Sequence, residues 1–418
     1  MVLTPARNER NVLLLTGVGH FTTHFFELMF PTLAVALARQ SELPLDDVLT
    51  WSFAGYLLFG LGGLPFGMLA DRIGSRLLLL VALFGLGVSA LAASEVTSPR
   101  ALTVCLAVMG GFASIYHPVG IGLISRTIDA RGRALGVNGL FGSAGIALTP
   151  VVTAALSEAV GWQETYRIVG YAMCAVAVAC AFLQVQEPLY AVAADVAPSQ
   201  PFVWRPLIVL LAAATLAGVS YRGNTLVQPG YFAAHVSAVW YGAATSAAYL
   251  LGTVGQYAGG LLADRRDLRR LYLTFHACSL PGLLAMTLLG GVPLVAAAAI
   301  FVFFSLGMQP IENTLLAHYT PARWRATIFG VKATGVFGIG SLAVWLVRWA
   351  DGVGGLSFVL LCLAGVVALV IGCAAVLLAL PDGGTTTPAR GGAAASQRTT
   401  PGAARGELLS PEIGPLRP

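Results

Sequence analysis

Long apolar runs alternate with short polar stretches along most of the chain. A helix needs about 20 residues to cross the hydrocarbon core of a bilayer, and twelve apolar runs reach or approach that length. The alternation therefore predicts an all-α membrane protein with twelve transmembrane helices. Their predicted limits are 12–38, 48–69, 77–94, 100–125, 134–157, 164–183, 206–233, 238–262, 271–290, 293–318, 326–347 and 355–380.

The composition agrees with a polytopic membrane protein. Hydrophobic residues make up 57% of the 418 residues and charged residues only 10%, whereas ordinary soluble domains carry about 25% charged residues. The mean hydropathy is +0.79. The six cysteines lie in apolar runs without Cys-x-x-Cys spacing, so they are predicted to be small packing residues and not a disulfide or zinc framework.

The arginines predict the orientation in the membrane. Fourteen arginines before residue 380 lie at the N-terminus or after even-numbered apolar runs, and only Arg39, Arg100, Arg167 and Arg348 lie in or beside the opposite loops. Short loops rich in Lys and Arg stay in the cytoplasm. Both termini are therefore predicted to lie in the cytoplasm. The predicted location of the protein is the bacterial cytoplasmic (inner) membrane. The same topology accounts for the net charge of +5 without nucleic acid as a partner.

The two halves of the chain repeat each other at a nearly constant spacing of 193, 192 and 192 residues. Such a repeat predicts two six-helix bundles related by an axis along the membrane normal. The paired segments are GMLADRIGSR (67–76) with GLLADRRDLRR (260–270), YHPVG (116–120) with MQPIEN (308–313), and ARGRA (130–134) with ARWRA (322–326). The predicted divisions are an N-terminal bundle at 1–183, a cytoplasmic linker at 184–205, a C-terminal bundle at 206–380 and a disordered cytoplasmic tail at 381–418.

The segment GMLADRIGSR resembles the signature loop of the major facilitator superfamily, Gly-x-Leu-Ala-Asp-Arg-x-Gly-x-Arg. The resemblance extends over residues 10 to 380 and implies transport by alternating access, with these loops as cytoplasmic latches. Gly74 allows a tight turn, and Asp71 can cap a helix start. The motif residues are Gly67, Asp71, Arg72, Gly74 and Arg76, with Asp264 and Arg265 in the second copy.

Two helices are similar to the fosmidomycin-resistance-like branch of that superfamily. His20 and Pro31 match its first helix, and His117 with Pro118 matches its Phe-His-Pro in the fourth. This branch implies export of drugs or metabolites. Where the family has an Asp four residues after the first histidine, this chain has His24.

Charged residues are rare inside the predicted spans. Only Glu27 and Glu312 among the acids, and Arg222 and Lys332 among the bases, lie deep in them. A charge at a helix centre costs about 2.5 to 3.5 kcal/mol, so such residues tend to face a cavity or each other. In the superfamily, helices 1, 4, 7 and 10 line the central cavity. The predicted substrate and proton pathway comprises His20, His24, Glu27, His117, Arg222, Asn224, Glu312, Asn313 and Lys332.

These residues allow more than one interpretation. Glu27 is our first choice for carrying a coupling proton, while Arg222 or Lys332 is expected to attract an anionic substrate group. Alternatively, the acids neutralise the bases in structural ion pairs. His20, His24 and Glu27 share one face of a helix, which could hold a metal ion. We expect cavity or packing histidines instead, and predict no metal and no cofactor.

The sequence predicts a secondary active transporter and not an enzyme. It contains neither a clustered catalytic set nor the Gly-x-x-x-x-Gly-Lys-Ser/Thr signature of an ATP-binding loop. We expect proton-coupled efflux of a drug or metabolite by a monomer whose partners are the small-molecule substrate, protons and the lipid bilayer. Proton-coupled uptake of a small organic anion stays open, as does a transporter-like membrane sensor.

Overall fold

The computed structural model describes residues 4–129, 131–187, 203–321 and 324–381. The chain divides into two units, residues 1–384 and 385–418. The second unit and most of the predicted linker and tail lie outside the described residues. The following description therefore concerns the first unit, in which the regular elements among the described residues are helical.

The first half of the chain forms helices α1 to α9. The predicted span 48–69 lies within three short helices in sequence, α2 to α4, and the predicted span 100–125 lies within two, α6 and α7. The bounds are α1 (Pro5–Ser41), α2 (Leu45–Thr50), α3 (Phe53–Leu61), α4 (Gly63–Ile73), α5 (Ser75–Glu95), α6 (Pro99–Ala113), α7 (Tyr116–Thr127), α8 (Arg131–Val160) and α9 (Trp162–Ala181).

The second half forms helices α10 to α15. Between α14 and α15 the chain passes through a π-helical turn, η2, and a 3₁₀ turn, η3. Gly355 adopts a φ of 72° inside α15 and bends it, so the eleventh and twelfth predicted spans meet there. The bounds are α10 (Trp204–His235), α11 (Tyr241–Ala263), α12 (Leu268–Met286), α13 (Gly291–Tyr319), α14 (Arg325–Ala333), η2 (Thr334–Gly338), η3 (Ile339–Leu342) and α15 (Ala343–Ala379).

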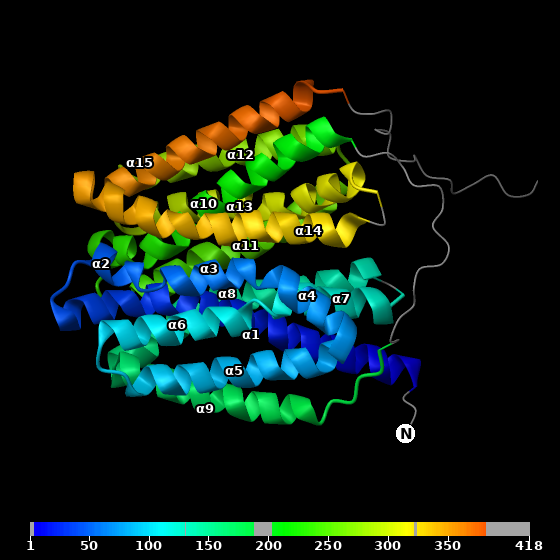
Figure 1. Cartoon of the computed structure of the whole chain (residues 1–418). Helices are drawn as coiled ribbons and strands as arrows, with labels where there is room; N and C mark the ends of the chain where they lie inside the picture. Colours follow the sequence, from blue (N-terminus) through cyan, green and yellow to red (C-terminus); the bar gives the residue numbers. More distant parts are fainter. Residues whose placement is uncertain (1–3, 130, 188–202, 322–323, 382–418) are drawn as a thin grey trace, which may run out of the picture. The chain divides into compact units, whose positions relative to one another are not determined.

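The twelve-helix fold is confirmed. Among the described residues, seven helices are long and apolar enough to cross a membrane, or eight if the pair Leu45–Leu61 and Gly63–Ala70, bent by 41°, counts as one span. One of the seven, Thr327–Ala379, holds two predicted spans joined at the bend. The three remaining predicted spans are α9, α11 and α12, which pack in the same helical assembly (Figure 1).

Local sequence signals explain several helix starts. Ser98 accepts a hydrogen bond from the Ala101 amide, and Pro99 occupies the first helical position of α6. Asp267 accepts a hydrogen bond from the Arg270 amide at the start of α12. These side chains satisfy amides that have no partner inside the helix.

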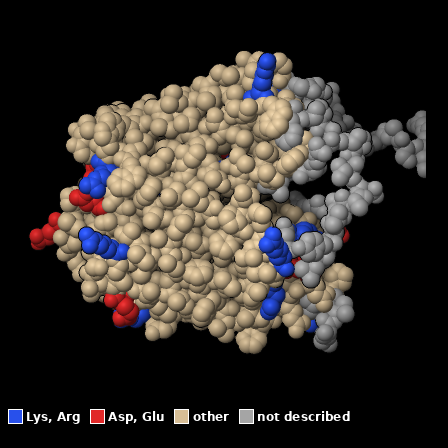
Figure 2. Space-filling model, in the orientation of Figure 1, with Lys and Arg blue, Asp and Glu red and all other residues tan. Residues whose placement is uncertain are grey.

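Helices α1 to α9 gather on one side of the assembly and α10 to α15 on the other (Figure 1). We call these groups the first and second bundles. They meet where α8 packs on α11, α1 on α10, and α3 on η2. Charged side chains collect at two opposite ends of the visible face, and the surface between these ends is uncharged (Figure 2). A wide uncharged belt is what a surface in contact with lipid tails requires.

The two ends differ in the chain segments that they carry. Residues 67–76 and 260–270 lie at one end, here called the basic end, while residues 42–52 and 236–241 lie at the opposite end. At the opposite end the bundles are joined by polar contacts. The Tyr241 hydroxyl donates to the Thr32 carbonyl (3.3 Å), and Arg348 pairs with Asp47 (2.7 Å).

Candidate translocation site

Glu27 of α1 and Arg222 of α10 form a buried ion pair between the two bundles. Glu27 Oε1 lies 2.7 Å from Arg222 Nη2, and each side chain is only 2% exposed. Removing both charges from water is costly, and their mutual attraction offsets much of that cost. The ion pair that the sequence left open as an alternative is therefore present. It joins two helices that belong to different bundles.

The second oxygen of the Glu27 carboxylate binds His24. Glu27 Oε2 lies 2.6 Å from His24 Nδ1, and the Glu27 carbonyl accepts a hydrogen bond of 3.0 Å from the Tyr56 hydroxyl. The Arg222 guanidinium lies 3.8 Å from the centroid of the Tyr56 ring, a cation–π contact. Sequence reasoning missed Tyr56, because one tyrosine in an apolar run carries no charge signal.

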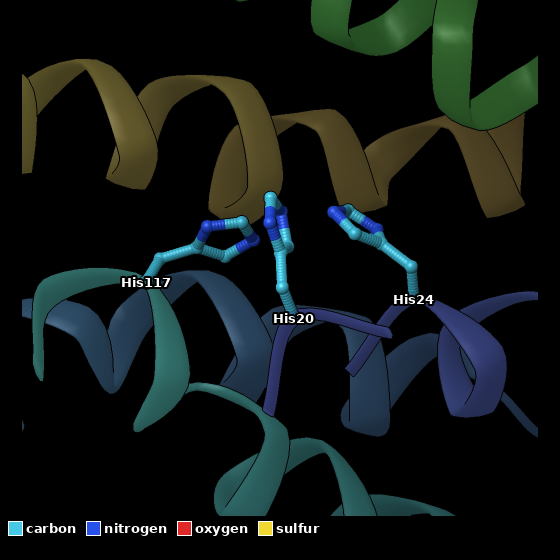
Figure 3. A group of neighbouring side chains, drawn as sticks. All are labelled: His20, His24 and His117. Atoms are coloured by element: carbon cyan, nitrogen blue, oxygen red, sulfur yellow. The ribbon is translucent and has the colours of Figure 1, made fainter. Parts of the chain in front are cut away.

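Three histidine rings lie together beside this ion pair. His20 and His24 project from α1 and His117 from α7, and the three rings lie next to one another (Figure 3). The ring centroids are 5.0 Å apart for His20 and His24, and 5.5 and 5.4 Å from each of them to His117. His117 also stacks on Phe337 of η2, at 5.4 Å between centroids. Glu27, which the sequence left open as a metal ligand beside two histidines, faces Arg222 and His24 Nδ1.

Residues of the first bundle hold the histidine cluster in place. His20 Nδ1 lies 2.9 Å from the Asn138 carbonyl, and the ring stacks on Tyr116 at 4.8 Å. The Tyr116 hydroxyl donates to Asn138 Oδ1 (2.7 Å). The helix breaks between α6 and α7 at residues 114–115, so Pro118 lies in the first turn of α7, where proline is tolerated.

A second buried ion pair lies within the second bundle. Glu312 of α13 binds Lys332 of α14 at 2.6 Å. The Tyr272 hydroxyl donates to Glu312 Oε2 (2.8 Å), and Lys332 donates to Asn313 Oδ1 (2.6 Å). The Glu312 side chain is 2% exposed and the Lys332 side chain 14%. Tyr272 is a further partner that the sequence did not identify.

The remaining polar pathway residues make neutral contacts. Asn224 donates to Gln228 one turn further along α10 (2.8 Å). A polar link that sequence reasoning missed joins the bundles through Gln256 of α11. Gln256 accepts from Ser143 of α8 (2.5 Å) and donates to Gln309 of α13 (3.2 Å). The sequence signal that could have identified this link is the presence of uncharged amide side chains, such as Gln256 and Gln309, inside apolar runs.

The loop motif makes the expected turn, and the cap of the helix that follows it comes from outside the motif. Gly74 makes the turn with a φ of 91°, as expected. Asp71, however, lies in the last turn of α4, because that helix continues to Ile73; its side chain lies outside the described part of the structure. The free amides at the start of α5 belong to Ser75 and Arg76. Both donate to Glu187 Oε1, at 2.7 and 3.3 Å. Glu187 therefore caps the start of α5, and the expected cap by Asp71 stays a prediction because it falls on a side chain outside the described residues.

The other motif residues have simpler surroundings. Arg76 donates to the carbonyls of Leu183 (2.8 Å) and Ala181 (2.5 Å), which fastens the loop to the end of α9. Gly67 lies against Pro118, because an added Cβ would come within 3.3 Å of the proline side chain. Arg72 and Arg265 are exposed at the basic end, and Asp264 is the C-cap residue of α11.

Comparison with known proteins identifies the class. Residues 16–344 match the Major Facilitator Superfamily, and the chain belongs to that family. It is a membrane transporter and not an enzyme.

Two solved structures share the fold. A bacterial homolog of the human lysosomal transporter Spinster, in an inward-facing and occupied conformation, matches with a TM-score of 0.74 and 14% sequence identity, covering 90% of this chain and 98% of that chain. The inward-facing and unoccupied form matches with a TM-score of 0.68 and 14% identity, covering 89% of this chain and 96% of that chain.

A shorter match connects the chain with the puromycin resistance protein pur8 of Streptomyces alboniger. The two are 30% identical over 117 residues, which is 27% of this chain and 22% of that protein. The match thus spans less than a quarter of the relative's length.

Proposed function

We propose that the protein couples proton movement to export of a small organic molecule across the bacterial cytoplasmic membrane. The observation that carries the proposal is the buried ion pair of Glu27 and Arg222 between the bundles. Alternating access requires the bundles to move relative to each other around a central site. A titratable group that joins the bundles at that site is suited to couple its proton to the motion.

The coupling follows from the cost of an unpaired buried charge. If Glu27 takes up a proton, Arg222 loses its counter-ion in an environment that excludes water. Breaking a buried pair in this way costs about 3 to 5 kcal/mol. That free energy favours a state in which Arg222 meets water or a substrate group. Glu27 can bind either a proton or a polar substrate group, so the two compete for it. This competition would exchange protons for substrate across the membrane.

Export is supported by two similarities, the partial match to a puromycin resistance protein and the resemblance of residues 19–33 and 110–120 to the fosmidomycin-resistance-like branch. The arginine asymmetry supports cytoplasmic termini. Reporter fusions after residues 44, 129, 195 and 380 should indicate outside, inside, inside and inside. A reversed signal at any of these positions contradicts the proposed orientation.

Uptake of an organic anion is the second candidate, and the direct contact between Glu27 and Arg222 favours it. Protonation of Glu27 frees Arg222, so a proton and a substrate anion would bind together at the pair. The two candidates differ in the direction of proton movement when substrate is added. Substrate-driven proton flux in proteoliposomes, recorded with a pH-sensitive dye, distinguishes exchange from co-transport.

The test uses the purified protein. A thermal-shift screen over puromycin, organic acids, phosphonates, amino acids and cationic drugs selects a ligand, and its accumulation in proteoliposomes is then driven by a pH gradient. We expect Glu27→Gln to abolish accumulation while substrate exchange continues, because glutamine mimics a permanently protonated carboxylate. Glu312→Gln is the matched control and should accumulate substrate as the parent does. If Glu27→Gln accumulates substrate normally, the assignment fails and Glu312 becomes the candidate.

A further inference from the structure

We propose that His20, His24 and His117 form a binding site for a divalent transition-metal ion such as Zn²⁺. One ring nitrogen from each of the three lies within 4.8 Å of the corresponding atoms of the other two. The rings converge at the junction of α1 and α7, as Figure 3 shows. Neutral imidazole is a common ligand for Zn²⁺, Cu²⁺ and Ni²⁺, and three such groups make a site with an open fourth position.

Hydrogen bonds orient two of the three rings for this role. His20 Nδ1 faces the Asn138 carbonyl at 2.9 Å, and His24 Nδ1 faces the Glu27 carboxylate at 2.6 Å. Both partners accept hydrogen bonds, so in each neutral ring Nδ1 carries the proton and Nε2 carries the lone pair. A carbonyl or carboxylate behind the ligating imidazole is the usual arrangement in metal sites, and it strengthens the ligand.

The third histidine supplies a separate indication. His117 Nε2 is buried and makes no hydrogen bond to the described residues. A buried polar atom without a partner is costly, and such atoms in folded proteins generally have one. Stacking on Phe337 explains the orientation of the His117 ring but provides no partner for its nitrogen. A metal ion bound between the three rings would provide it.

The site needs only small side-chain rotations to bind an ion. With Zn–N bonds of about 2.0 to 2.1 Å in a tetrahedral arrangement, the ligand nitrogens lie roughly 3.3 Å apart. Because α1 and α7 belong to the same bundle, the three rings can approach without movement between the bundles. Gly142 leaves the necessary space. An added Cβ there would come within 2.5 to 2.7 Å of His20 Nε2, Cε1 and Cδ2. Such similar distances place Gly142 over the face of the His20 ring.

The first test titrates Co²⁺ into the purified full-length protein, prepared in detergent with an affinity tag that contains no histidine. We expect one Co²⁺ per chain, with the visible absorption bands of a tetrahedral or five-coordinate complex, and displacement by Zn²⁺. X-ray absorption of the Zn²⁺ complex should show imidazole scattering from about three ligands. These measurements use the unmodified protein, so they do not depend on the folding of any variant.

Variants then locate the site. His20→Gln, His24→Gln and His117→Gln should each weaken Zn²⁺ binding at least tenfold. Glu27→Gln should weaken it about 10- to 100-fold, because the carboxylate positions His24, and Gly142→Ala should weaken it by displacing His20. The matched controls are His235→Gln and His318→Gln, which replace histidines outside the cluster and should bind as the parent does.

Three results would overturn the proposal. They are the absence of Co²⁺ bands with metal in large excess, X-ray absorption that shows mainly oxygen or sulfur ligands, and unchanged Zn²⁺ affinity in folded variants of all three clustered histidines. The assays measure binding alone. Their failure would therefore leave the proposed transport function unaffected.

Discussion

The two buried ion pairs look alike in the sequence but differ in what they join. Glu27–Arg222 connects α1 with α10 and so crosses between the bundles, whereas Glu312–Lys332 connects α13 with α14 inside one bundle. The first pair excludes solvent from both side chains, and the second leaves Lys332 14% exposed. A charge pair can report relative movement of two bodies only if it has one member on each. The scarcity of charged residues in the predicted spans therefore identifies both ion pairs. The helices that each pair joins show that Glu27–Arg222 is the pair suited to coupling.

Removing the cation should have the largest effect and should distinguish the pairs most strongly. Arg222→Met leaves the Glu27 carboxylate buried and unpaired, and breaking such a pair costs about 3 to 5 kcal/mol. His24 remains as a donor, so we expect the lower part of that range. Lys332→Met should cost about 2 kcal/mol, because Glu312 keeps Tyr272 and lies next to a partly exposed position. The free energy of unfolding from SDS titration in mixed micelles measures both losses.

A double variant provides the control for this prediction. Glu27→Gln combined with Arg222→Met removes both charges and should regain most of the lost stability. If the double variant is no more stable than Arg222→Met alone, the loss arises from packing and the ion pair is not its cause.

The conformational equilibrium should respond next, and only to the pair between the bundles. Leu43 and Val239 are exposed at the opposite end, one on each bundle. Spin labels at these positions, in a background without the six native cysteines, report the distance between the bundles. We expect Glu27→Gln to increase the population of separated states about tenfold, which corresponds to roughly 1.4 kcal/mol. Glu312→Gln should leave the distance distribution unchanged. Equal responses in the two variants would remove the distinction between the pairs.

The tyrosine variants should reverse the order of the two pairs, because the tyrosine beside Glu312 should lose more stability than the tyrosine beside Glu27. Tyr56→Phe loses a hydrogen bond to a neutral carbonyl but keeps the ring beneath Arg222, so about 1 kcal/mol should be lost. Tyr272→Phe loses a hydrogen bond to the Glu312 carboxylate, which should cost about 1.5 to 3 kcal/mol. SDS titration of the two single variants checks the order. A greater loss in Tyr56→Phe would show that its hydroxyl does more than bind the Glu27 carbonyl.

The fold was largely predictable because hydrophobic length is a strong signal. Each apolar run near 20 residues became a helix or a closely joined set of helices, and the repeat near 192 residues identified the second half as a copy of the first. Breaks inside the spans were harder to predict. The breaks at residue 62 and at residues 114–115 depend on packing between helices, which hydropathy does not record.

The charged residues of the candidate site could be selected from the sequence, but their contacts could not. The cost of burying charge selected Glu27, Arg222, Glu312 and Lys332. Which acid meets which base depends on how the helices are arranged in space. Tyr56 and Tyr272 escaped notice because a phenol costs much less to bury than a charge. The loop motif selected Gly74 correctly, but Glu187, more than a hundred residues away, caps the next helix.

The contact between α3 and η2 has a consequence for the speed of each transport cycle. A Cβ added to Gly60 would come within 2.1 Å of the Gly338 amide nitrogen, so the two backbones touch there without side chains between them. Interlocked side chains must change rotamers before the surfaces that carry them can part, and they must find the same rotamers again on return. Glycine has no side chain and therefore no rotamer to change. Parting of the bundles at this point therefore requires no change of rotamer at Gly60 or Gly338.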